Sequence, residues 1–181
     1  MFKKIIISLL LLALLVGCGN NSANSDLNIA DMSEYKIESD RFLDTTLPEA
    51  VELINQSAIF YFGYPDCPWC LELVPILAEV LSEKNIYVHY INVQTAEFSD
   101  IRDEENSDFT TLLNFFSEHL IKPDGVHIEM PVPFVVGVKN GVISQSNLGT
   151  LPTHNAYERL MSDQEKAQLK ELLSKLVESI N

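Results

Sequence analysis

Positive charge is scarce in this 181-residue sequence. Lysines and arginines number 12 against 26 aspartates and glutamates, which gives a formal net charge of −14 at pH 7. A nucleic-acid-binding surface needs a basic footprint to neutralise phosphates, and broad adhesion to anionic lipid needs one as well. The charge balance therefore argues against both, and we expect no nucleic acid among the partners.

The sequence also lacks the motifs of several enzyme classes. None of its seven glycines belongs to a phosphate-cradling loop, and no segment shows a paired nucleophile–base signature. A zinc site on neighbouring cysteines would need histidine ligands, and His119 and His127 are too far apart for the usual spacing. We therefore expect no metal and no cofactor.

Long apolar runs are absent except at the N-terminus. Lys3 and Lys4 precede the run Ile5 to Val16, which is too short to span a membrane comfortably. The run leads into Gly17-Cys18, which resembles the end of a bacterial lipoprotein signal. The resemblance implies cleavage before Cys18 and diacylglycerol on its sulfur, and two acyl chains anchor a protein stably. An ordinary signal peptide with a chance cysteine is the alternative.

Cysteine is scarce too, with Cys18, Cys67 and Cys70 alone. If Cys18 carries lipid, the exported domain has one cysteine pair and no third thiol. Export would place this pair outside the cytosol, where disulfides persist. A bridge that closes so short a loop removes little chain entropy, so it is a weak structural staple and suits exchange chemistry better.

The chain divides into three parts on composition. Residues 1–17 are predicted as the signal peptide. Residues 18–39, rich in asparagine and serine at first, are predicted as a flexible tether, and residues 40–181 as one domain. The localisation that follows is extracytoplasmic, with a lipid anchor in the cell membrane.

Hydrophobic periodicity and turn signals predict the order helix, strand, helix, strand, helix, β-hairpin, helix. In that order, the predicted elements cover residues 40–55, 58–62, 68–84, 86–93, 108–120, 130–144 and 162–180. This order predicts an α/β domain with a mixed sheet, in which parallel crossovers precede an antiparallel hairpin.

The motif Cys67-Pro68-Trp69-Cys70 stands between a buried strand and a helix. Pro68 favours a helix start, and the amino end of a helix favours a thiolate at Cys67. We expect Cys67 to be the nucleophile and Cys70, one turn inside, to be the resolving thiol. Trp69 is expected at the rim of the site, where its ring offers apolar area to peptides; simple packing on the domain is the alternative. Asp66 is expected to oppose the thiolate by charge repulsion.

Four features together resemble the thioredoxin fold family. These are the Cys-x-x-Cys motif, Pro75 five residues after its second cysteine, a second strand that ends at Asn92, and Val132-Pro133 before a strand and hairpin. The resemblance covers residues 46–181. It implies a thioredoxin-like mixed sheet flanked by helices, with a helical insertion at about 95–130 between the second strand and the cis-proline strand.

The resemblance also implies a site and an activity. The bond before Pro133 would be cis and lie against the cysteines, and Val132 would offer its backbone to an extended substrate peptide. The implied function is exchange of disulfides with protein or peptide substrates, with an unidentified redox partner and in a direction that the sequence leaves open. A non-catalytic accessory module, as in bacteriocin export systems, is the alternative.

One position departs from the family pattern. Many members carry a buried acid six residues before the first cysteine, and this chain has Tyr61 there. Proton transfer must then use water or another group. Glu72 and His89 are nearby in sequence, and we expect them on a solvated face or at a sheet edge.

Overall fold

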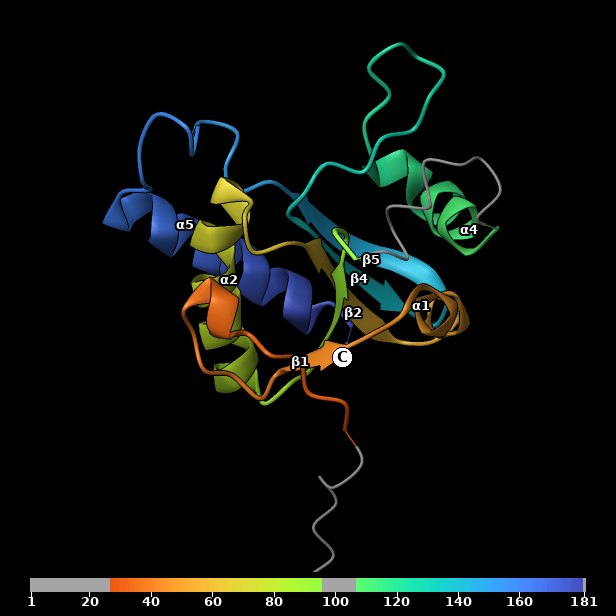
Figure 1. Cartoon of the computed structure of the whole chain (residues 1–181), viewed down its shortest axis with the longest axis horizontal. Coiled ribbons are helices and arrows are strands. Elements are labelled where there is room, and N and C mark those ends of the chain that lie inside the picture. Colours follow the sequence, from red (N-terminus) through yellow and green to blue (C-terminus); the bar gives the residue numbers. More distant parts are fainter. Residues whose placement is uncertain (1–26, 96–106, 181) are drawn as a thin grey trace, which may run out of the picture.

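The computed structural model describes residues 27–95 and 107–180. It contains a five-stranded mixed sheet of order β1-β3-β2-β4-β5 (Figure 1). The strands are β1 (Phe42–Asp44), β2 (Ala58–Gly63), β3 (Val88–Asn92), β4 (Phe134–Lys139) and β5 (Val142–Leu148). The helices are α1 (Leu47–Leu53), α2 (Pro68–Lys84), α4 (Ser107–Phe116) and α5 (Asp163–Glu178), with the short 3-10 helices η1 (Ser33–Tyr35) and η3 (Ser117–His119).

The strand directions confirm the predicted fold class. β1, β3 and β2 run parallel, whereas β4 and β5 are antiparallel to their neighbours. The α4 helix lies between β3 and β4 in the chain, at the place of the predicted insertion. The result is a thioredoxin-like mixed sheet flanked by helices.

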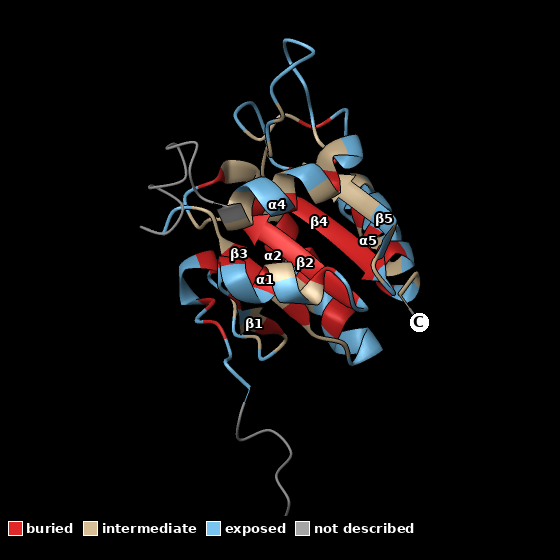
Figure 2. Ribbon diagram, turned by 90° about the vertical axis from the view of Figure 1, so that its right-hand side faces the viewer, coloured by how far each residue is buried: buried red, intermediate tan, exposed pale blue. Residues whose placement is uncertain are grey.

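Side chains of β2 alternate between the two faces of the sheet. Ile59 and Tyr61 join the core that α2 and α5 cover, whereas Phe60 and Phe62 join the core under α1 and α4. All residues of β2 are buried, as expected for a central strand with helices on both faces. Figure 2 shows α1 and α4 over the buried strands, with their outer surfaces exposed.

The α2 helix begins and ends where the sequence predicts. Cys67 is its N-cap and Pro68 takes the first turn, where a missing N–H costs no hydrogen bond. Asn85 ends the helix in the left-handed conformation, with φ of 54°. Pro75 lies inside the helix, as predicted. This start places both cysteines at the carboxyl end of β2.

The predicted helix over residues 40–55 is wrong at its start. Its first residues form the edge strand β1, which pairs with β3, and α1 begins later. The reason is the burial of Phe42, which is fully enclosed on the α2 face of the sheet. The capping box of Thr46 and Glu49 is present as predicted and fixes the start of α1.

Part of the predicted tether, residues 18–39, packs on the domain. Ala30, Met32 and Tyr35 are buried on the α2 face, and Tyr35 is only 2% exposed. Apolar and polar residues are mixed in this segment without a clear period, so the sequence pattern does not assign these side chains to the core. The domain therefore begins before residue 40.

Some predictions fall outside the described residues. The signal peptide over 1–17, Cys18 and part of the insertion, residues 96–106, are among them. Among residues 27–95 and 107–180, no helix has the length and apolar character needed to cross a membrane.

The predicted hairpin and the last helix are confirmed. Asn140 and Gly141 form the turn between β4 and β5 with φ of 52° and 77°, a conformation that asparagine and glycine tolerate best. Ser162 caps α5 through a capping box with Glu165. The α5 helix packs on α2, so it supports the helix that carries the cysteines.

Candidate functional site

Cys67 and Cys70 are free thiols in direct contact at the start of α2. The backbone N–H of Cys70 donates to the Cys67 sulfur at 3.3 Å, which satisfies one of the unpaired amides of the helix end. The Cys67 thiol in turn faces the carbonyl of Val132 at 3.8 Å. Cys67 is 3% exposed and Cys70 is fully buried, so Cys67 is the sulfur nearer to solvent.

The two thiols differ in acidity. The Cys70 thiol donates to the Cys67 sulfur, and the N–H groups of Cys70 and Trp69 add to this, so the pKa of Cys67 falls from 9.0 to about 7 despite its burial. Burial and the adjacent Cys67 thiolate raise the pKa of Cys70. Asp66, which we expected to oppose the thiolate, is exposed to water and is not among the groups that set the pKa of Cys67.

The peptide bond between Val132 and Pro133 is cis, as the resemblance implies. Pro133 is buried at the start of β4, beside the carboxyl end of β2. Its carbonyl accepts a hydrogen bond from the Gly149 N–H at 2.8 Å, which ties this turn to the end of β5. The structure thus brings Cys67, Val132 and Pro133 together, although the motifs lie more than sixty positions apart.

Trp69 is half-buried and contacts Tyr157. The two rings meet edge to face, with centroids 4.6 Å apart and planes at 86°. Tyr157 is 77% exposed. An apolar surface therefore lies directly beside the cysteines.

Glu72 does not lie on a solvated face, and that expectation is wrong. Its side chain is 10% exposed, accepts a hydrogen bond from the Met161 N–H at 2.6 Å, and faces Nε2 of His154 at 3.3 Å. The His154 ring is fully buried and its Nδ1 lies 2.8 Å from the Thr150 hydroxyl. Glu72 and Met161 are 89 positions apart, so no sequence spacing signals the contact. These bonds attach the β5–α5 loop to α2.

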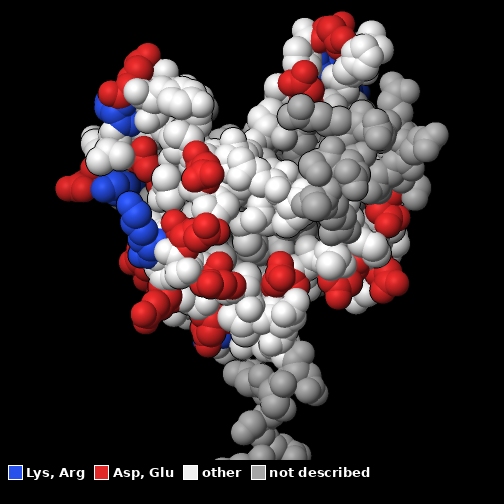
Figure 3. Space-filling model, viewed as in Figure 1, with Lys and Arg blue, Asp and Glu red and all other residues white. Residues whose placement is uncertain are grey.

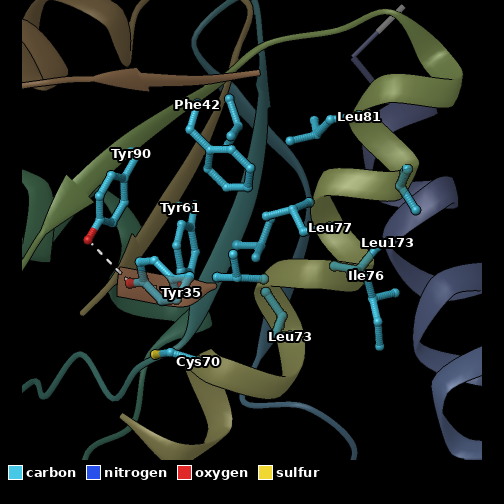
Figure 4. Close-up of a cluster of buried hydrophobic side chains, with 14 of the residues drawn as sticks. Tyr35, Phe42, Tyr61, Cys70, Leu73, Ile76, Leu77, Leu81, Tyr90 and Leu173 are labelled. Carbon is cyan, nitrogen blue, oxygen red and sulfur yellow. Dashed lines mark hydrogen bonds between the residues drawn. The ribbon is translucent and has the colours of Figure 1, made fainter. Parts of the chain in front are cut away.

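The tyrosine cluster, formed by Tyr35, Tyr61 and Tyr90, is a second feature that sequence reasoning missed. The Tyr61 hydroxyl donates to the Tyr35 hydroxyl at 3.2 Å, and the hydroxyls of Tyr35 and Tyr90 are also 3.2 Å apart. Figure 4 shows Cys70 next to these rings. Of the three, Tyr61 alone carries a sequence signal, since it stands where many members of the resembled family have a buried acid.

The surface beside the site is hollowed. Figure 3 shows many acidic groups on this face, and a hollow between two projections, the β5–α5 loop and the segment before β4. The α2 helix begins beside this hollow.

His89 is half-buried, and its Nδ1 lies 3.1 Å from the Thr45 hydroxyl. Within the described ranges, no three side chains of the metal-binding types cluster to hold an ion.

Comparisons with known proteins find solved structures of thioredoxins at low sequence identity. No family model matches the chain. An oxidised thioredoxin from Plasmodium falciparum is 17% identical, with 75% of this chain and 95% of that chain covered and a TM-score of 0.40. Thioredoxin O2 from Arabidopsis thaliana is 13% identical, with 74% and 95% covered and a TM-score of 0.41.

Proposed function

We propose that this chain is a thiol–disulfide oxidoreductase that acts on protein or peptide substrates through Cys67 and Cys70. The observation that carries the proposal is a pair of free thiols in contact at the amino end of α2, with the Val132 carbonyl 3.8 Å from the Cys67 sulfur. In this setting the pKa of Cys67 is lowered to about 7 and that of Cys70 is raised. A thiol whose pKa is near the ambient pH is the best attacking group in disulfide exchange. Cys67 is therefore ready to attack at neutral pH, while Cys70 stays protonated until it is needed.

The reaction needs no cofactor in either direction. In the reductive direction the Cys67 thiolate attacks a substrate disulfide, forms a mixed disulfide and releases one substrate thiolate. Cys70 then loses its proton and attacks the Cys67 sulfur, which releases the second substrate thiolate. The two cysteines end as a disulfide and the substrate as a dithiol, and a redox partner must restore the starting state.

The surroundings of the cysteines suit an extended peptide. The Val132 carbonyl lies 3.8 Å from the Cys67 sulfur, so a chain that pairs with the Val132 backbone would present its own sulfur to Cys67. Trp69, with Tyr157 against it, offers apolar area on the other side. We assign Val132, Pro133 and Trp69 to substrate binding on this basis.

The anchor and the location are proposed from the sequence. The basic start, the short apolar run and Cys18 support a lipoprotein that faces the extracytoplasmic side of the membrane. Replacing Cys18 by serine should release the protein from the membrane fraction of its host. Retention of the variant in that fraction would contradict the lipid anchor.

Exchange activity is tested with insulin reduction and with oxidation of a dithiol peptide. The purified protein should catalyse at least one of them, and Cys67→Ser should abolish it. The control is Asp66→Asn, next to the nucleophile but outside its contacts, which should keep full activity. If the unsubstituted protein and Cys67→Ser behave alike in both assays, the chain is a non-catalytic binding module of the kind that accessory proteins of bacteriocin export systems represent.

A further inference from the structure

Three phenol groups, those of Tyr61, Tyr35 and Tyr90, form a hydrogen-bonded cluster next to the buried cysteine. The Tyr61 hydroxyl donates to the Tyr35 hydroxyl at 3.2 Å, and Cys70 lies next to these rings. The Tyr35 hydroxyl contacts that of Tyr90 at the same distance. The cluster therefore connects Cys70 with β3, across the α2 face of the sheet (Figure 4).

The cluster is almost closed to solvent, and its exposed fraction is largest at Tyr90. Tyr61 is fully buried, and Tyr35 and Tyr90 are 2% and 5% exposed. The rings pack on one another, with Tyr61 and Tyr90 stacked at 5.4 Å between centroids. A hydroxyl in such a place needs a hydrogen-bond partner, and here the partners are one another and Cys70.

Among the described residues, the carboxylates of Asp44 and Glu34 act on Tyr90, the last hydroxyl of the hydrogen-bonded chain. Cys70 and the two other tyrosines surround Tyr61 and Tyr35, whereas Tyr90 also feels the carboxylates of Asp44 and Glu34. A negative field favours a proton that arrives there. The near end has the thiol that must lose a proton, and the far end has the groups that attract one.

We propose that the tyrosine cluster conducts the proton of Cys70 during the resolving step, in place of the buried acid of the resembled family. This inference rests on the proposed exchange function. Cys70 is fully buried, so its proton cannot pass directly to water. The hydroxyl chain gives that proton a route.

In the proposed transfer each phenol gains one proton as it loses another, so no phenol becomes charged. The Cys70 proton moves to the Tyr61 oxygen as the Tyr61 proton moves to Tyr35, the Tyr35 proton to Tyr90, and the Tyr90 proton to water. The Cys70 sulfur then bonds to the Cys67 sulfur, the bond from Cys67 to the substrate sulfur breaks, and the departing thiolate takes up a proton from water. The oxidative direction runs these steps in reverse.

Because the phenols are buried, they can pass a proton on but cannot hold a negative charge. Burial raises the pKa of Tyr61 and Tyr35 well above the ordinary value, and the pKa of Tyr90 to about 12. None of them holds a negative charge at neutral pH, so each can release a proton only while it gains another. The same Tyr61 hydroxyl can turn toward Cys70 once the thiolate exists and stabilise it, which lowers the pKa of Cys70 against the effect of burial.

The chromogenic disulfide DTNB separates the two halves of the reaction. Attack by Cys67 on DTNB releases one coloured thiolate in a concentration-dependent phase, and resolution by Cys70 releases a second in a concentration-independent phase. We expect Tyr61→Phe to slow the second phase about tenfold and to leave the first unchanged, which corresponds to about 1.4 kcal/mol. Tyr35→Phe should also slow the second phase, although Tyr35 is one hydroxyl further from the reacting sulfur.

Two further measurements separate conduction from packing. The second phase of the unsubstituted protein should be slower in D₂O, and this isotope effect should shrink in Tyr61→Phe. The matched control is Tyr87→Phe, which removes a phenol that lies under Arg41 and outside the cluster, and which should change neither phase. Because the isotope effect is measured on the unsubstituted protein, the test holds even if a variant folds poorly.

The outcomes distinguish this inference from the proposed function. If the protein never releases the second thiolate and catalyses no exchange, the proposed function itself fails. If exchange is normal but Tyr35→Phe resolves at the unsubstituted rate, or D₂O has no effect on the second phase, the tyrosine cluster conducts no proton and the inference is overturned.

Discussion

The acidity of Cys67 depends first on the thiol of Cys70, and replacing Cys70 by alanine should reverse much of it. The substitution removes the sulfhydryl donor and keeps the backbone N–H of residue 70, which donates to the Cys67 sulfur at 3.3 Å. Because the sulfhydryl donor is the largest contribution that lowers the pKa of Cys67, that pKa should rise above 7. The difference from 9.0 that remains measures the balance between the N–H groups of the helix end, which lower the pKa, and the burial of the sulfur, which raises it.

The size of the effect follows from the two pKa values. A fall from 9.0 to about 7 favours the thiolate by about 3 kcal/mol. At pH 7 it raises the thiolate fraction about 50-fold, while the lower basicity makes each thiolate about eightfold less nucleophilic. The net gain in alkylation rate at pH 7 is about sixfold, which is the largest loss that Cys70→Ala can cause by this route.

The sign of the effect depends on pH, which makes the assay sharp. Iodoacetamide alkylation of Cys67 should be slower in Cys70→Ala at pH 7, where the thiolate fraction decides the rate. At pH 10 the Cys67 thiol is largely ionised in both proteins. Alkylation should then be faster in Cys70→Ala, because its more basic Cys67 thiolate is the better nucleophile. The two pH–rate curves should therefore cross, and thiolate absorbance gives an independent pKa for each protein.

The matched control is Asp66→Asn, which removes a charge next to Cys67 without touching its hydrogen bonds. Its pH–rate curve should superimpose on that of the unsubstituted protein, because Asp66 is exposed to water. Equal Cys67 pKa values in Cys70→Ala and the unsubstituted protein would refute the reasoning. So would a shift in Asp66→Asn as large as that in Cys70→Ala.

Three other contacts give measurable predictions. Glu72→Ala leaves the Met161 N–H without its acceptor, so the free energy of unfolding in urea should fall by about 1–3 kcal/mol and the tryptophan fluorescence should change. The control Glu79→Ala alters an exposed side chain and should change neither quantity. Phe116→Ala empties a fully buried site between α4 and the sheet and should cost about 3–5 kcal/mol in the same assay; a loss below 1 kcal/mol would mean that α4 does not pack there. Ser162→Ala removes the cap of α5 and should cost about 1 kcal/mol, which Ser162→Asp should largely restore.

Local signals in the sequence were enough to predict most of the fold. Pro68 marks the start of α2, Asn140-Gly141 marks the hairpin turn, and the capping box at Ser162 marks α5, and each acts within a few residues of itself. The strand β1 carries no such signal. It forms because Phe42 finds a buried place beside Tyr61, and that place is made by distant parts of the chain.

The residues of the candidate site also divide into those with a local sequence signal and those without one. The sequence predicts the pairing of Cys67 and Cys70 because one helical turn separates them. It predicts the position of Pro133 because the hairpin follows at a fixed distance. The contact of Glu72 with His154 and the hydroxyl contact of Tyr35 with Tyr61 have no fixed spacing. Burial, which gives these polar groups their effect, is a property of the assembled core and is not encoded by any one segment.

The burial of Cys67 has a consequence for which clients the protein can accept. Because only 3% of this residue is exposed and the Val132 carbonyl lies 3.8 Å from its sulfur, a disulfide held rigidly inside a folded protein would meet the surrounding groups before the sulfurs could approach. A loose, unfinished polypeptide can bend one sulfur toward Cys67. We therefore expect selection by shape, in favour of unfolded chains and against proteins whose folding is complete.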